Sequence, residues 1–444
     1  MKHRHLSRFV TKHSGLTLAL ALCGWLSACG GGGVDTSLSS AALANPGGTG
    51  TVLHQAVVAP PPPPPAAAAS QAGGPDAGLT PIQLLGKQIF NDPNLSEPAG
   101  TACVSCHRPG TGWADNHGSL IGVAQGSKPT SLGFRNALTN AYSASIPPFA
   151  FVTTPGGAIQ ARGGHFWDGR ADTLAAQALG PFLNPLEMNN TNAAAVVTKI
   201  AGAPYAANFQ AVFGASALSN PTTAFNQVGL ALQAFEQTSR LQNFTSKYDA
   251  VVRGKATFSA AEQHGLALFQ DRTRANCVGC HNMNPSSGNP ADSPFTNAAY
   301  FATGIPRNTA IPSNANPNFF DLGLCGPART APTLPAGVNI ADFCGKFRVP
   351  TLRNVAQRQR YMHNGFFTDL HDVVAFYSTR VSNPQHWYGA AGVPNDIPAA
   401  YARNVETRIA PFNRSAAQGP VLTVAEINDL VTFLQTLNDG FTAP

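Results

Sequence analysis

The sequence has few charged side chains. Lys, Arg, Asp and Glu make up 11% of its 444 residues, whereas about a quarter is usual in soluble proteins. The formal net charge is +6, and Lys2, Arg4, Arg8 and Lys12 supply four of these charges within residues 1–28, which contain no acid. Without these four the chain carries +2. This weak charge, with no basic run beyond residue 28, excludes a nucleic-acid-binding surface.

The N-terminal region lacks an apolar run long enough to span a bilayer. Residues 16–26 are apolar, follow a basic segment and end before Ser27-Ala28-Cys29. This pattern is typical of a bacterial lipoprotein signal peptide with an acylated cysteine, and an ordinary signal peptide cut nearby is the alternative. We predict a signal peptide over residues 1–29 and a periplasmic protein. Its anchor would be Cys29 in the outer membrane, because Gly30 and not Asp follows. Residues 30–77, rich in Gly, Pro and Ala, predict a disordered tether.

Four of the eight cysteines form two copies of a C-x-x-C-H motif, the attachment sequence of c-type haem. Residues at i, i+3 and i+4 share one helix face, so both thiols can bond the porphyrin while the imidazole reaches the iron. A closed zinc site would need a second ligand pair nearby, and a thioredoxin-like C-x-x-C would not need the histidine. The predicted haem residues are Cys103, Cys106 and His107 in the first motif and Cys277, Cys280 and His281 in the second.

The two motifs have similar surroundings. Gly86–Asp92 precedes the first and Gly265–Asp271 the second, and both fit the pattern G-x-x-(I/L)-F-x-D. This repeat predicts a mainly α protein made of two cytochrome c-like haem domains with long loops, an N-terminal one over residues 78–255 and a C-terminal one over residues 256–444. Cys325 and Cys344 lie in a Gly/Pro-rich loop of the second part. In an oxidising compartment a disulfide between them is expected, and two unlinked thiols are the alternative.

Further motifs occur in a fixed order across residues 79–440, and with them the chain resembles the bacterial dihaem cytochrome c peroxidase/MauG superfamily. The resemblance implies two haems that flank the domain interface, with Trp167 between them as an electron relay. It also implies Glu187 as the acid/base for peroxide, with Gln177 and Pro181 lining its pocket; a core tryptophan and a surface glutamate are the alternatives. The motifs are Arg135-Asn136, Phe166–Arg170 (FWDGR), Gln177–Pro181 (QALGP), Glu187–Asn190 (EMNN), Pro350–Asn354 (PTLRN) and Tyr361–Gly365 (YMHNG).

The same resemblance implies a calcium ion between the haems. Asn136 matches its side-chain ligand, and backbone carbonyls near Arg358 and Arg360 match the others. Carbonyl oxygens suit Ca²⁺ whatever side chains they belong to, although two nearby cationic groups oppose a divalent ion. We therefore predict one bound Ca²⁺ beside the two haems.

Two positions depart from the usual peroxidase pattern. Val123 stands where many relatives have a loop histidine that caps the first haem; valine cannot bind iron, so this haem should be open, unless His117 in the same loop caps it. Tyr377 stands where peroxidases have a methionine ligand to the second haem, and MauG and MbnH have tyrosine there. The chain has only four methionines, and Met362 is the rival ligand. A phenolate favours higher oxidation states of iron than a thioether does.

These residues predict a periplasmic oxidoreductase that reacts with hydrogen peroxide at the open first haem. It would store oxidising equivalents over both haems, in a bis-Fe(IV)-type state, and use them to oxidise a Trp or Tyr side chain of a secreted partner protein. The first alternative is a peroxidase that removes peroxide with electrons from small c-type cytochromes or cupredoxins. The second is an electron-transfer cytochrome without catalytic turnover.

Overall fold

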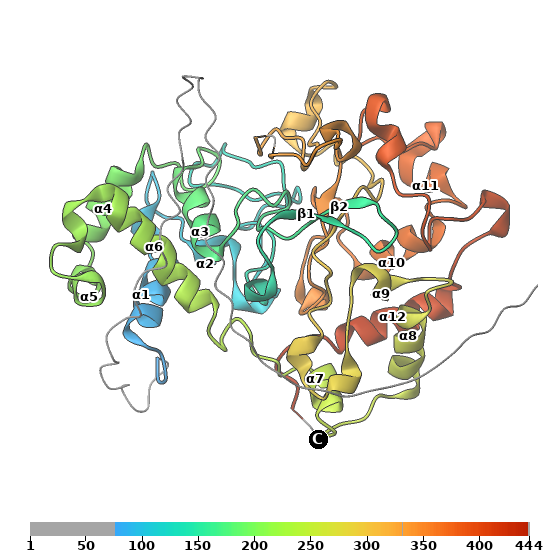
Figure 1. Ribbon diagram of the computed structural model, residues 1–444, viewed down its shortest axis with the longest axis horizontal. Helices are drawn as coiled ribbons and strands as arrows, with labels where there is room; N and C mark the ends of the chain where they lie inside the picture. The colour runs from blue at the N-terminus through green and yellow to red at the C-terminus, as the bar shows by residue number, and fades with distance from the viewer. Residues whose placement is uncertain (1–75, 331, 443–444) are drawn as a thin grey trace, which may run out of the picture. The chain divides into compact units, whose positions relative to one another are not determined.

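The computed structural model of the chain describes residues 76–330 and 332–442 (Figure 1). The predicted signal peptide, Cys29 and nearly all of the predicted tether lie outside these residues. Among the helices described, none is long and apolar enough to cross a membrane.

The described chain is mainly helical, as predicted, and has only two short two-stranded sheets (Figure 1). Irregular loops and 3₁₀ turns connect the elements. Strand β1 pairs antiparallel with β2, and β3 with β4. The strands are β1 (Ala150–Thr153), β2 (Ile159–Arg162), β3 (Tyr300–Phe301) and β4 (Phe347–Arg348). The α-helices are α1 (Pro81–Phe90), α2 (Cys103–Cys106), α3 (Leu174–Leu183), α4 (Ala193–Ala201), α5 (Ala206–Phe213), α6 (Pro221–Glu236), α7 (Lys247–Val252), α8 (Ala260–Gln270), α9 (Cys277–Cys280), α10 (Leu370–Thr379), α11 (Pro384–Tyr388) and α12 (Val424–Gln435).

The repeated sequence pattern corresponds to a repeated helix pair. Gly86 of α1 lies so close to α6 that a Cβ atom would come within 1.9 Å of the Ala231 carbonyl oxygen. Gly265 of α8 approaches α12 in the same way, and a Cβ atom there would lie 2.0 Å from the Asp429 carbonyl oxygen. Only glycine allows either contact. The glycine of the G-x-x-(I/L)-F-x-D pattern is therefore needed for close helix packing in both copies.

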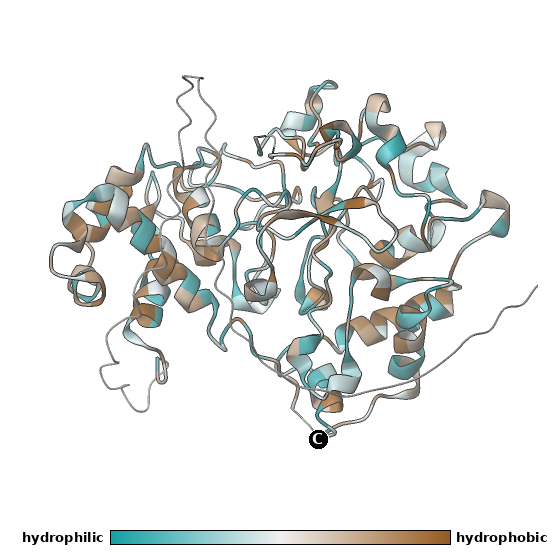
Figure 2. Ribbon diagram, in the orientation of Figure 1, coloured by the Kyte–Doolittle hydropathy of each residue, from teal (hydrophilic) through white to brown (hydrophobic). Residues whose placement is uncertain are grey.

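The phenylalanine of the same pattern packs identically in the two copies. The rings of Phe90 and Phe235 lie 5.3 Å apart at 59°, and those of Phe269 and Phe433 also lie 5.3 Å apart at 59°. Each helix pair carries a buried apolar cluster, one formed by residues between 85 and 241 and the other by residues between 248 and 437. In Figure 2 these helices carry both hydrophobic and hydrophilic stretches, as expected for helices with one buried face. The predicted domain boundary after residue 255 stays a prediction.

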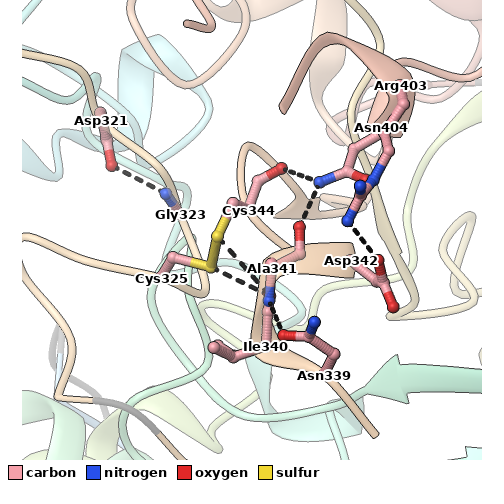
Figure 3. Close-up of a disulfide and its surroundings, with 10 residues drawn as sticks. All are labelled: Asp321, Gly323, Cys325, Asn339, Ile340, Ala341, Asp342, Cys344, Arg403 and Asn404. Atoms are coloured by element: carbon pink, nitrogen blue, oxygen red, sulfur yellow. Dashed lines mark hydrogen bonds and ion pairs between the residues drawn. A yellow bond between two sulfur atoms is a disulfide. The ribbon is translucent and has the colours of Figure 1, made fainter. Parts of the chain in front are cut away.

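The predicted disulfide is present between Cys325 and Cys344 (Figure 3). Both sulfur atoms lie near the carbonyl oxygen of Ile340, at 3.3 and 3.5 Å. The amide of Asn404 donates to the carbonyls of Ala341 and Cys344, so a distant segment also holds this loop. The disulfide is confirmed as a structural element of the second part of the chain.

Candidate functional site

The second C-x-x-C-H motif opens onto a large, mostly apolar cavity. Cys277 and Cys280 lie at the two ends of α9, and both line this cavity together with His281. Helix α10 brings Tyr377 to the same cavity, and the loop after β2 brings Trp167. Both thiols are unpaired. Trp167 and Tyr377 thus meet at one cavity although they are 210 positions apart in the sequence.

The ring of His281 is held in the orientation that a metal ligand needs. Its Nδ1 lies 2.9 Å from the carbonyl oxygen of Phe295, so this nitrogen carries the proton and Nε2 is left as an acceptor. Burial lowers the pKa of His281 to about 4, although the carbonyls of Phe295 and Pro350 act against this. The imidazole is therefore neutral, as iron ligation requires. Two free thiols, a neutral imidazole and an apolar cavity fit a covalently bound haem.

The surroundings of Tyr377 act on the pKa of its phenol in both directions, and burial has the largest effect. Burial raises its pKa, and the thiols of Cys280 and Cys277 add to this effect. Thioether formation with a haem would prevent both sulfur atoms from ionising, so their contribution to this effect would be lost. Arg380 and a hydrogen bond with the Thr303 side chain act in the opposite direction and lower the pKa. With an iron ion as a further positive charge, a phenolate at this position is physically reasonable.

The methionines differ in their positions relative to this cavity. Met362 lines it, as Tyr377 does, so Met362 stays the rival ligand. Met283 packs into the second hydrophobic cluster and is not among the residues that line the cavity. Met188 is buried in the first cluster. In the described part of the chain, no three or more His, Cys, Asp or Glu side chains converge as a metal site, so the zinc alternative has no ligand set there.

The first C-x-x-C-H motif has the same local geometry. Cys103 and Cys106 lie on α2, and Nδ1 of His107 lies 3.1 Å from the carbonyl oxygen of Trp113. Burial lowers the pKa of His107, while the carbonyls of Trp113 and Leu138 and the carboxylate of Asp115 raise it. This imidazole is again held with one nitrogen bonded to the backbone. It fits the same covalent haem attachment.

Both histidines are supported by the same hydrogen-bonded framework, which the sequence did not reveal. The hydroxyl of Thr139 donates to the carbonyl of Gly112 at 2.7 Å, and that of Thr351 donates to the carbonyl of Pro294 at 2.7 Å. The residue that follows each threonine donates its N–H to the carbonyl bonded by the corresponding histidine. Residues 138–142 and 350–354 are therefore structural equivalents, although threonine is the only side chain they share at equivalent positions.

Glu187 faces the first motif from a turn that follows α3. The turn is fixed by hydrogen bonds from the N–H of Glu187 to the Asn184 carbonyl and from the N–H of Met188 to the Pro181 carbonyl. The charge of Glu187 acts on both Cys106 and Cys103, so its carboxyl lies close to the predicted first haem. Burial raises the pKa of Glu187, while Arg170 and a hydrogen bond with Asn184 lower it. Gln177 and Pro181 lie one turn apart on α3, and both are partly buried.

The loop that carries Val123 packs directly onto Glu187. The N–H of Ser127 donates to the Glu187 carbonyl at 2.7 Å, and Gly126 touches the same backbone. Val123 itself is fully buried. Nδ1 of His117 lies 3.0 Å from the Gln125 carbonyl oxygen of its own loop, so that nitrogen is already engaged. His117 as a cap of the first haem stays an alternative prediction.

Trp167 lies beside the segment that joins the two candidate sites. Its indole N–H donates to the carbonyl of Asn136 at 2.8 Å. Residues 136–139 line the second cavity, and the Leu138 carbonyl reaches His107 of the first motif. The next residue, Asp168, is fully buried and forms ion pairs with Arg135 and Arg170 at 2.7 and 2.9 Å. The tryptophan therefore lines the second cavity and is hydrogen-bonded to a segment that reaches both sites.

A buried carboxyl near the first motif was missed by sequence reasoning. Glu236 at the end of α6 is 3% exposed, and its charge acts on Cys103. Asn140 donates to one of its oxygens at 2.9 Å, and the other oxygen has no partner. Burial raises the pKa of Glu236 to about 8. No motif could have revealed it, because its partner is 96 positions away.

The second copy of the repeat has no counterpart of the Glu236–Asn140 pair. Glu236 follows Phe235, just as Leu434 follows Phe433, and Asn140 follows Thr139, just as Leu352 follows Thr351. Both leucines line the second cavity. The first site therefore has a carboxyl and an amide where the second site has two leucines.

The proposed calcium ligands are only partly brought together. The side-chain nitrogen of Asn136 lies 3.1 Å from the carbonyl oxygens of both Arg360 and Met362. The Arg358 carbonyl instead accepts a hydrogen bond from the Tyr361 hydroxyl at 2.9 Å. A cation at this place would need the amide of Asn136 turned so that its oxygen faces the two carbonyls. The carbonyls of Arg360 and Met362 are thus within reach of the Asn136 side chain, and Arg358 as a further carbonyl ligand of Ca²⁺ stays a prediction.

The two arginine side chains are both bound to backbone carbonyls. Arg358 donates to the carbonyls of Thr351 and Arg353 at 2.9 and 2.8 Å, and burial lowers its pKa to about 10. Arg360 donates to the Leu120 carbonyl. Both arginines line the same cavity as Asn136, so the objection that two cationic groups oppose a divalent ion remains, and calcium stays a prediction.

Comparisons with known proteins find similarity over most of the chain. Residues 82–257 match the family model described as di-haem cytochrome c peroxidase. The chain is 36% identical to the methylamine utilization protein MauG of Paracoccus denitrificans over 370 residues, which cover 81% of this chain and 88% of that protein. It is 29% identical to the cytochrome c551 peroxidase of Pseudomonas aeruginosa over 296 residues, which cover 66% of this chain and 71% of that protein.

Among solved structures, the dihaem peroxidase BthA from Burkholderia thailandensis is similar over most of its length. It matches with a TM-score of 0.74 and 39% sequence identity, covering 81% of this chain and 86% of that one. The similarity thus spans both C-x-x-C-H motifs and the helices that hold them.

Proposed function

Because the chain belongs to the dihaem cytochrome c peroxidase/MauG family and is an oxidoreductase that uses hydrogen peroxide, we propose that it oxidises a Trp or Tyr side chain of a partner protein. The family implies two haem c groups. When bound, these haems supply the reaction with peroxide and share its two oxidising equivalents. The residues of this chain would hold the haems in place and would transfer protons and electrons to and from them.

We propose that Glu187 is the acid/base of the peroxide reaction. Its carboxyl lies close to the first motif, and burial raises its pKa, which brings the acid nearer to the working pH. One peroxide oxygen must lose a proton and the other must gain it as the O–O bond breaks. A single carboxyl can do both by accepting the proton and returning it. Gln177 and Pro181 on the adjacent helix would shape the space in which peroxide is held.

Trp167 is proposed to carry electrons between the two centres. It is buried, its N–H is fixed by the Asn136 carbonyl, and it lines the second cavity. A large aromatic ring system in a fixed position is suited to electron transfer, because its distances to both sites stay constant. The buried Asp168 with its two arginines keeps this part of the chain in place.

The observation that carries the proposal is Tyr377 at the second cavity. A phenolate oxygen is a hard, anionic ligand, so it stabilises high oxidation states of iron and lowers the reduction potential. The centre would then accept electrons poorly from a small carrier protein but would hold an oxidising equivalent well. Such an oxidant can act on a protein side chain at the surface without any contact between substrate and iron.

The second candidate function is peroxide removal with electrons from a small c-type cytochrome or cupredoxin. Met362 favours it, since it lines the same cavity and a thioether ligand would raise the potential of the second haem. The relative from Pseudomonas aeruginosa, whose name is cytochrome c551 peroxidase, also favours it. The ligand of the second haem therefore separates the two functions.

The test uses the purified dihaem protein and two measurements. Stoichiometric peroxide should produce a near-infrared charge-transfer band between the haems, and the Tyr377→Phe variant should lose it. In steady state with peroxide, reduced small c-type cytochrome should be oxidised only slowly. Fast oxidation of the cytochrome together with no near-infrared band would contradict partner-protein oxidation. The Met362→Leu variant is the matched control and should keep the band.

We also propose that the protein works in the periplasm, anchored to the outer membrane through Cys29, with one Ca²⁺ at Asn136. Both proposals rest on sequence: the signal-like N-terminus and the family resemblance. Mass spectrometry of the purified N-terminal peptide tests the first, because acylation of Cys29 adds a fatty-acid mass. Calcium analysis of the wild type and the Asn136→Ala variant tests the second.

A further inference from the structure

Tyr377 is connected to the molecular surface by a cluster of aromatic rings. The ring of Phe376 lies 5.9 Å from that of Tyr377, its neighbour on α10, and is fully buried. On the other side of Phe376 lies Trp387 of α11, with ring centres 5.4 Å apart and ring planes at 87°. Phe367 packs against both Phe376 and Trp387, at 5.4 and 5.7 Å. The cluster thus leads from the predicted second haem to α11.

Trp387 is where this cluster reaches solvent. Its side chain is partly exposed, and the fully buried Phe376 lies behind it. The ring of the exposed residue His386 covers part of the indole, with ring centres 4.4 Å apart. A protein that docks on α11 can therefore approach the indole closely without reaching the haem cavity.

The chemistry of these side chains favours Trp387 as the residue that becomes oxidised. Phenylalanine is much harder to oxidise than tryptophan. Phe376 and Phe367 therefore fill the space through which the electron passes and are not themselves oxidised. The other aromatic neighbour of Tyr377 is Phe412, stacked at 5.5 Å and 24°. The guanidinium of Arg380 lies 3.6 Å above Phe412, and this positive charge opposes a second one on that side.

The hydrogen bond of the Trp387 indole determines whether a proton leaves with the electron when Trp387 is oxidised. Its N–H donates to the Thr379 hydroxyl at 3.0 Å, and this hydroxyl donates its own proton to the Ala375 carbonyl at 2.6 Å. A hydroxyl bound in this way is not a base at neutral pH. Trp387 therefore keeps its proton when oxidised, and the step transfers an electron alone.

We propose that Trp387 is a redox relay between the tyrosine-ligated second centre and a partner protein docked at α11. This proposal rests on the proposed function and specifies the path by which electrons reach the second centre. Trp387 gives one electron to the oxidised centre and becomes a cation radical, which takes an electron from a Trp or Tyr side chain of the partner. Two such passes remove two electrons and, with two protons, convert one hydrogen peroxide into two waters.

The test needs no partner protein. The purified dihaem protein receives stoichiometric peroxide without any electron donor, and oxidised residues are mapped by peptide mass spectrometry. Without a donor, the Trp387 radical forms a C–O bond with water, releases two protons and gives a second electron to the remaining oxidising equivalent of the same peroxide, so oxygenated Trp387 is expected. The Tyr377→Phe variant should lose most of this product, and its haem content serves as the control for folding.

Two substitutions at the relay itself sharpen the test. In Trp387→Phe, which keeps the packing, the peroxide-oxidised state followed by haem absorption should decay several-fold more slowly, whereas Trp387→Tyr, which is still oxidisable, should restore the decay. Equal decay in wild type and Trp387→Phe, or oxygen on Trp113 and none on Trp387, would overturn the relay. Neither outcome depends on a partner protein, so the relay and the proposed function can fail separately. If Trp387 is oxidised as expected but no side chain of a partner protein ever is, only the proposed function is refuted.

Discussion

Replacing Glu236 with glutamine should remove a pH dependence of stability that originates at the first haem site. Glu236 is buried beside Asn140, and one of its oxygens has no partner. Burial raises its pKa from the ordinary value of 4.5 to about 8. Between these values the unfolded chain loses the proton while the folded protein keeps it. The free energy of unfolding therefore falls as pH rises through this window.

The size of the effect follows from the shift. Each pH unit within the window lowers the free energy of unfolding by about 1.4 kcal/mol, and the full window by about 5 kcal/mol. This is large compared with the roughly 5–15 kcal/mol by which folded proteins are usually stable. Below pH 4.5 both states are protonated and the stabilisation is fully present. Above pH 8 both are ionised and the decline ends.

The assay is guanidinium unfolding of the dihaem protein at several pH values from 5 to 9. Wild type and Glu236→Gln should have similar midpoints at pH 5 and should diverge toward pH 8, with the variant more stable, because an amide cannot ionise and still accepts the Asn140 hydrogen bond. Glu262→Gln is the control, since its carboxyl pairs with Lys247 at 2.6 Å and its pKa is lowered. Parallel curves for wild type and Glu236→Gln would refute the reasoning.

Three further predictions concern the haem sites and the disulfide. Glu187→Gln should slow the reaction with peroxide by about 10²–10⁴-fold in stopped-flow absorption while both haem spectra persist; an unchanged rate would exclude the proton transfer. Tyr377→Met should raise the reduction potential of the second haem in spectroelectrochemistry, and an unchanged potential would show that another residue is the ligand. Replacing Cys325 and Cys344 with serine opens a loop of 19 residues and should cost about 3 kcal/mol in guanidinium unfolding; an unshifted midpoint would show that Asn404 and its neighbours hold the loop alone.

The sequence was most informative where a short motif carries its own geometry. Each C-x-x-C-H motif forms one helical turn with its histidine bonded to the backbone, because neighbours in sequence are neighbours on a helix face. The repeated glycine also predicted a repeated structure, and the contacts of Gly86 and Gly265 give the reason. The disulfide needed only two cysteines and an oxidising compartment.

Features that depend on long-range contacts could not be predicted in this way. The pairing of Glu236 with Asn140 joins positions 96 residues apart, and nothing local marks either residue. Residues 138–142 and 350–354 fold alike because their backbones make the same hydrogen bonds, and backbone groups leave little trace in the sequence. The position of Trp387 against the buried Phe376 likewise depends on how α11 returns to α10.

The shared segment 136–139 also bears on how the protein matures. If each C-x-x-C-H motif binds its own haem, a chain with one haem would precede the chain with two. The Leu138 carbonyl reaches His107, and residues 136–139 form part of the wall of the second cavity. The first haem to be attached would then rest against a segment that the other site also uses. We therefore expect loading to be cooperative, so that chains with a single haem are rare during biogenesis.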